Sequence, residues 1–229
     1  MSRLPIALAA VISFACTAAP LEQFSSAEIS AAMGSSLRQG ADNAIAKLGR
    51  EDGFNKNDKL HIDLPEPLRK VESKLRMIAL GDDLDALETA MNRAAEAAVP
   101  RAKKLLHSAA IDNISAADAK ALFTGKEDAV TAYFRKHTEK KLNADFLPVV
   151  SRVVQKAELA DKYNAMAERA AKFGLMQDAE PVEQYVTRKA LDGLYATMAE
   201  EERQLRKNPV KADTDLLKKV LESVRFGAQ

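Results

Sequence analysis

The chain has 229 residues, with only 9 glycine and 8 proline residues but 41 alanines. This composition favours helices and argues against a β-sandwich, a β-barrel, a collagen-like chain or disorder. Its 34 lysine and arginine residues nearly balance 33 aspartate and glutamate residues, and the net charge of +1 gives no reason to expect nucleic acid as a partner.

The first eighteen residues have the organisation of a secretory signal. Arg3 supplies a positive charge, residues 4–15 form an uncharged apolar run too short to span a bilayer, and small residues follow. A buried N-terminal helix is the alternative, but Pro5 and the missing polar face disfavour it. We expect loss of residues 1–18 and a mature periplasmic chain, 19–229, that folds as one domain.

Cys16 is the only cysteine, so the chain cannot form an intramolecular disulfide. Ala15 before it resembles the start of a bacterial lipoprotein, although Ser13 and Phe14 depart from the preferred residues. Lipidation of Cys16 is therefore the alternative to a soluble periplasmic protein. The membrane is expected as a partner only in that case.

From Ser26 to Val224, apolar residues recur every three or four positions, which is typical of helices that bury one face. Ser26 is the expected N-cap of the first helix and Gly49 its end. Residues 59–64 alternate with period two, and the following Pro65 limits them to an extended or edge segment. The pattern predicts an all-α, bundle-like single domain with this one short extended segment.

Caps, glycines and prolines set the bounds of the later helices. The second helix is expected from Glu66 or Pro67 to Gly81, and the third from Asp82 to about His107 with a kink at Pro100. Further helices are predicted over residues 115–124, 126–142, 148–173, 181–207 and 213–224.

Sequence motifs for catalysis, cofactors and metals are missing. His61, His107 and His137 lie in three different predicted elements, with no cysteine or other histidine at metal-binding spacing, so solvated histidines are favoured over a metal site assembled in space. There is no glycine-rich phosphate loop, nucleophile elbow or zinc-protease helix. We therefore predict no metal, no cofactor and no assigned catalytic residue.

The first candidate polar site is Asn92, Arg93 and Glu96 on one predicted helix, within the alanine-rich stretch 90–99. Small side chains there allow a neighbouring helix to approach closely. Glu96 could be a partly buried acid or base with a shifted pKa. The alternative, which we favour, is an ion pair with Arg93 and an amide that together fix the helix register.

The second candidate is one face of the helix over residues 181–207, where Tyr185, Lys189 and Asp192 follow at spacings of four and three. Gly193 costs about 1 kcal/mol in a helix interior, so it should allow close contact with another element or a ligand. Residues 200–207 are expected to be a solvated helix end with a Glu202–Arg206 pair.

Short segments along most of the chain also carry a family resemblance. They are Leu48-Gly49, Asp52-Gly53-Phe54 and residues 62–68, 92–98, 133–135, 185–194, 200–202, 206–209 and 214–220. These segments resemble a family of exported bacterial proteins known as domain of unknown function 4197. The resemblance covers residues 24–221 and implies one all-helical domain of the bacterial envelope. It brings no activity and no catalytic residues.

Two hypotheses on function follow. The first is a non-catalytic envelope module that binds a partner protein or an apolar ligand between helices. The alternative is a hydrolase acting on an envelope substrate, with Glu96 or Asp192 as acid or base. A dry cleft that places one of these carboxylates opposite a second polar group would favour the enzyme. A fully paired Glu96 covered by helices would favour the module.

Overall fold

The computed structural model describes residues 21–112, 116–171 and 180–227. Within these ranges the chain is mostly helical and contains no strand, which confirms the all-α prediction. The predicted signal and Cys16 lie outside the described residues. Cleavage, lipidation and the single mature domain therefore stay predictions.

Most of the described residues lie in helices. The helices are α1 (Ser26–Leu48), α2 (Glu66–Met77), α3 (Gly81–Ala98), α4 (Lys103–Asp112), α5 (Ala116–Thr124), α6 (Ala129–Lys156), α7 (Leu159–Ala171), α8 (Val182–Lys207) and α9 (Asp215–Gly227). Short 3-10 turns are η1 (Leu21–Gln23), η2 (Val99–Ala102) and η3 (Pro209–Lys211).

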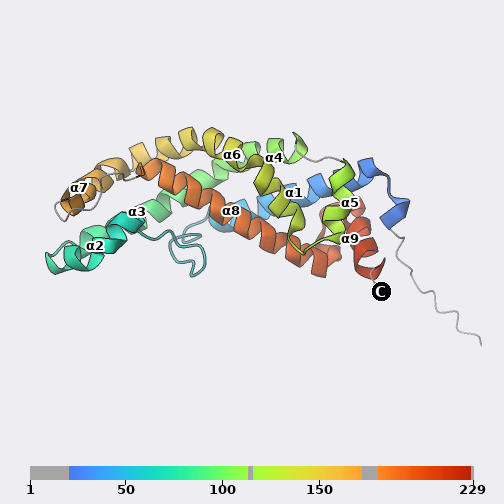
Figure 1. Ribbon diagram of the computed structural model, residues 1–229, viewed down its shortest axis with the longest axis horizontal. Helices are drawn as coiled ribbons and strands as arrows, with labels where there is room; N and C mark the ends of the chain where they lie inside the picture. The colour runs from blue at the N-terminus through green and yellow to red at the C-terminus, as the bar shows by residue number, and fades with distance from the viewer. Residues whose placement is uncertain (1–20, 113–115, 172–179, 228–229) are drawn as a thin grey trace, which may run out of the picture.

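The bundle is elongated, and α8 runs through its middle (Figure 1). Helix α8 packs against α6, α1 and α3, and the buried apolar side chains of the described residues form one connected core. One end of the molecule carries α2, α7 and the start of α3, and the other carries α5 and α9 (Figure 1).

The first helix begins one residue earlier than predicted, because Ser25 and not Ser26 is its N-cap. The Ser25 hydroxyl accepts a bond from the Glu28 backbone N–H at 3.2 Å, and the Glu28 carboxylate accepts one from the Ser25 N–H at 2.8 Å. This is a complete capping box, in which two backbone donors at the helix start are satisfied. Gly49 ends the helix as predicted.

Two prolines behave differently from the prediction. Pro100 breaks the expected long helix into α3 and α4, joined by the 3-10 turn η2, where a kink was predicted. Pro148 was predicted to start a new helix, which is wrong, because α6 continues through it. Pro148 and Ala144, whose carbonyl it leaves without a donor, are both exposed, so water can satisfy that carbonyl. The helix instead ends before Glu158, which has a φ of 52°.

The end of α8 is only partly solvated, because Glu201, Glu202 and Leu205 are buried while Glu200, Gln204 and Lys207 are exposed, so the prediction of a solvated end is wrong for its inner face. The Glu202–Arg206 pair forms at 2.8 Å, but Glu202 also accepts bonds from the N–H groups of Val130 and Thr131 at the start of α6. Arg206 donates to carbonyls at the end of α5. The pair therefore satisfies helix-end groups that have no partner within their own helix.

The close contact predicted at Gly193 is with the ring of Phe54, which precedes α2 and is fully buried. A Cβ atom on Gly193 would lie 2.6 Å from Cε1 of Phe54, closer than side chains tolerate. The glycine thus lets the aromatic ring pack directly on the backbone of α8.

Because of this contact, replacing a helical glycine by alanine should change the free energy of unfolding in opposite directions at Gly193 and Gly40. Gly193→Ala should lower the free energy of unfolding by about 1–3 kcal/mol, because the ring of Phe54 must move. Gly40→Ala in α1 should be neutral or stabilise by up to about 1 kcal/mol, because alanine favours helix. Its Cβ would meet Met198 at an ordinary 3.7 Å. Urea unfolding measures both, and a stabilised Gly193→Ala would contradict the packing described.

Candidate functional site

The candidate site is built where α3 meets the connection between α1 and α2, residues 49–65. This connection is the longest stretch without helix in the part of the chain that the structure describes. Buried backbone groups outside helices and sheets still need hydrogen-bond partners. Here many of the partners are three side chains of α3, Glu88, Asn92 and Glu96, which we call the polar stripe. Their spacing of four places them on one helix face.

Glu96 is 5% exposed and has both carboxylate oxygens engaged. Oε1 accepts bonds from the backbone N–H groups of Phe54 at 3.0 Å and Asn55 at 2.9 Å. Oε2 pairs with Arg93 at 2.7 Å, and Arg93 also pairs with Asp52 at 2.6 Å. The predicted pair of Glu96 with Arg93 is confirmed. Its two bonds to the connection were not predicted.

Asn92 is fully buried and pairs with the backbone of Ile62 in both directions. Its Oδ1 accepts from the Ile62 N–H and its Nδ2 donates to the Ile62 carbonyl, both at 2.9 Å. Nδ2 also donates to the carbonyl of Glu88. The side-chain amide thus takes the place of a neighbouring strand. This explains why residues 59–64 alternate like a strand, with Ile62 and Leu64 buried, although no sheet forms.

Glu88 pairs with His61 at the other end of the stripe. Its Oε1 lies 2.7 Å from Nε2 of His61, and its Oε2 accepts the Leu64 N–H at 3.2 Å. Burial alone would lower the pKa of His61. The hydrogen bonds to Glu88 and to the Asn55 carbonyl, with the charge of Glu88, outweigh burial, so the pKa of His61 is raised.

The second predicted face of α8 only partly belongs to this site. The Tyr185 hydroxyl donates to the Asp63 carbonyl at 2.8 Å, and burial raises the pKa of Tyr185 to about 12, so it remains a donor at neutral pH. The Lys189 ammonium lies 5.7 Å from the centre of the Tyr185 ring. Asp192 is not part of the site, because it pairs with Arg135 of α6 at 2.5 Å.

The structure therefore brings Asn92, Arg93, Glu96 and Tyr185 to one connection and leaves Asp192 outside it. Sequence reasoning missed Glu88 and Asp63, and it considered His61 only as one of three separate histidines. Glu88 could have been found from its spacing, because it precedes Asn92 by the same four residues that separate Asn92 from Glu96. The partner segment is about 30 to 40 residues away along the chain, and no local pattern indicates it.

Two surface hollows adjoin the connection. One, of about 620 Å³, is lined by charged and polar side chains that include Lys47, Arg50 and Asp52. A smaller one, of about 220 Å³, is lined by Arg50, Glu51, Arg93 and Glu96. Glu96 thus reaches the edge of a hollow, but its oxygens are held by the N–H groups described above.

Comparison with known protein families identifies the family to which the chain belongs. The family described as Protein of unknown function (DUF4197) matches residues 23–222. The chain belongs to this family. The match confirms the resemblance inferred from the sequence, whereas the bacterial and exported character stays a prediction. No curated protein and no solved structure matches the chain. Among the described residues, no helix combines the length and apolar character needed to cross a membrane.

We expect Glu96→Gln to lower the free energy of unfolding by about 1–3 kcal/mol, because the new amide places donors against Arg93 in a buried position. The same change at Glu139, which forms an exposed pair with Arg135, should cost less than about 1 kcal/mol. Chemical unfolding of both variants tests this. Equal effects at the two positions would show that Glu96 does not hold the connection.

Proposed function

We propose that the protein is a non-catalytic helical module of the bacterial envelope that binds a partner protein. The observation that carries this proposal is the bonding of Glu96. A general acid or base must exchange a proton with its substrate within hydrogen-bond reach. Both oxygens of Glu96 instead hold the backbone of Phe54 and Asn55 and the guanidinium of Arg93.

The hydrolase hypothesis has less support from the contacts. Asp192 is occupied by an ion pair with Arg135, and Arg135 lies over the Tyr195 ring at 5.2 Å. The hollow at Glu96 is open and has arginine and glutamate side chains at its edge.

The end of the molecule formed by α2, α3 and α7 is the surface that best fits a partner (Figure 1). Met77, the last residue of α2, and Ile78, which follows it, are 85% and 55% exposed. Between α3 and α7 lies a hollow of about 240 Å³, lined by Ala86, Ala165 and Met166 with charged side chains at its edge. Apolar surface with a charged rim is typical of protein interfaces.

The envelope location rests on two observations. The N-terminal residues have the order of a secretory signal, and the family resemblance is to exported proteins. The partner is therefore expected among periplasmic proteins or the periplasmic parts of membrane proteins. An apolar ligand held in the hollow between α3 and α7 is the other occupant that this surface would fit.

Photo-crosslinking in cells tests the proposed surface. A photoreactive residue in place of Met77 should give one discrete adduct with a periplasmic protein, and one in place of Val210, which is 71% exposed near α9, should not. Adding Ala165→Glu, which fills the hollow with a charged side chain at an exposed position, should abolish the adduct. Equal adducts at both positions, or one that survives Ala165→Glu, would contradict this surface.

The non-catalytic part of the proposal is tested with the Glu96→Gln variant. The cellular phenotype of this variant should follow its remaining folded fraction. A variant with unchanged melting temperature and a lost phenotype would instead support acid–base chemistry at Glu96.

A further inference from the structure

The imidazole of His61 lies between two hydrogen-bond acceptors. Its Nδ1 is 3.0 Å from the Asn55 carbonyl oxygen, and its Nε2 is 2.7 Å from the Glu88 carboxylate. A neutral imidazole has one N–H, and a carbonyl oxygen can only accept, so Nδ1 carries the hydrogen. The lone pair of Nε2 then faces a carboxylate. A positive species, either a proton or a metal cation, must lie between them.

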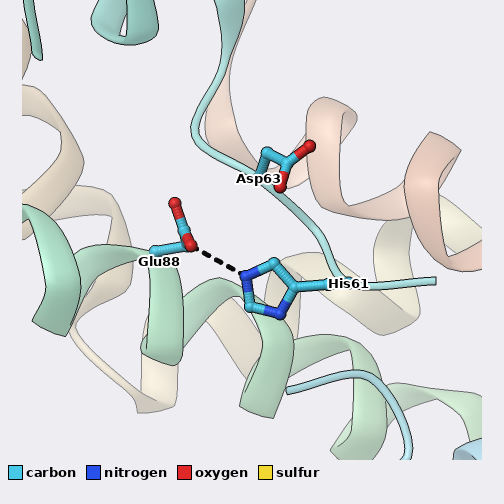
Figure 2. A group of neighbouring side chains, drawn as sticks. All are labelled: His61, Asp63 and Glu88. Atoms are coloured by element: carbon cyan, nitrogen blue, oxygen red, sulfur yellow. Dashed lines mark hydrogen bonds and ion pairs between the residues drawn. The ribbon is translucent and has the colours of Figure 1, made fainter. Parts of the chain in front are cut away.

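Asp63 supplies a second carboxylate next to this pair (Figure 2). One ligand atom each from His61, Asp63 and Glu88 lies within 4.8 Å of the others. No other group of three potential ligands occurs in the ranges that the structure describes. Imidazole nitrogen and carboxylate oxygen are the ligands of many zinc sites with three protein ligands and one open position.

We propose that His61, Asp63 and Glu88 bind one divalent transition-metal cation of the zinc class. Nε2 of His61 and one oxygen from each carboxylate are its ligands, and water completes the coordination. Zinc bonds of about 2.0–2.2 Å place tetrahedral ligand atoms roughly 3.3 Å apart. Binding therefore requires Glu88 to move slightly away from His61 and the exposed Asp63 side chain to move closer.

The surrounding contacts hold the ligands in place before a cation arrives. The bond from Nδ1 of His61 to the Asn55 carbonyl fixes the tautomer that leaves Nε2 free for metal, as outer-shell partners commonly do. Glu88 is fixed through its second oxygen by the Leu64 N–H. Ile62, between the two ligands of the connection, is held by both bonds from Asn92, and Tyr185 holds the Asp63 carbonyl.

A second histidine–carboxylate pair in the chain provides an internal control. Nε2 of His107 lies 2.8 Å from Asp42, at a similar exposure to that of His61. The same oxygen of Asp42, however, also binds Lys103 at 3.0 Å. The lysine already supplies a positive charge there, and among the described residues no third ligand completes the group. We therefore expect metal at His61 and none at His107.

Zinc titration of the untagged protein tests the site. One zinc ion should bind per chain, with the affinity measured by competition with a zinc indicator. Long-range proton–nitrogen NMR should show a shift of His61 Nε2 and none at His107 or His137. Asp63→Asn should weaken binding by at least about 10–100-fold, since even loss of an outer-shell partner has that effect. Asp42→Asn, the matched control, should leave the affinity unchanged.

The histidine shifts are measured on the wild-type protein, so they do not depend on how a variant folds. Asp63 is exposed, so Asp63→Asn should keep the fold. The proposal is overturned if saturating zinc leaves the His61 nitrogens unshifted. It is also overturned if Asp63→Asn and Asp42→Asn bind zinc equally well. Neither outcome bears on the partner surface at α2, α3 and α7, because the metal site does not depend on it.

Discussion

The hydrogen bonds between the polar stripe of α3 and the connection before α2 are the interaction on which the rest of the structure depends. The connection has no helix or sheet to satisfy its backbone, yet Phe54 and Ile62 are buried. Glu96 and Asn92 supply the missing partners. Each buried group left without a partner costs about 1–3 kcal/mol, and whole domains are stable by only about 5–15 kcal/mol. Without these bonds Phe54 would lose its place against Gly193 of α8.

Much of the fold could be predicted from sequence because the deciding interactions are local. Apolar periodicity and caps set α1 and α8 to within a residue or two, and the Glu96–Arg93 pair lies within one helical turn. The errors came from the three-dimensional surroundings of single residues. Pro148 is tolerated because it faces water, and Glu202 is buried because it caps α6, about 70 residues earlier in the chain. No local sequence spacing indicates that Pro148 is exposed or that Glu202 is buried.

The stripe also explains why the polar residues of an alanine-rich helix are a candidate active site in the sequence, even though an ion pair is the favoured interpretation there. Buried carboxylates and amides occur both in catalysis and where the chain needs partners for its backbone. Glu96 and Asn92 belong to the second class, since their polar atoms bind backbone or Arg93. Glu88 differs, because one of its oxygens faces the ring nitrogen Nε2 of His61. The same face of α3 therefore holds the connection through Asn92 and Glu96 and contributes Glu88 to the proposed metal site.

Hydrogen exchange of backbone amides is the measurement that tests the role of the stripe most directly. The N–H groups of Phe54, Asn55 and Ile62 lie outside any helix but are bonded to Glu96 and Asn92. We expect them to exchange as slowly as core amides of α3 and α8, because all open together. Rapid exchange at these three amides beside a protected α3 would contradict the account.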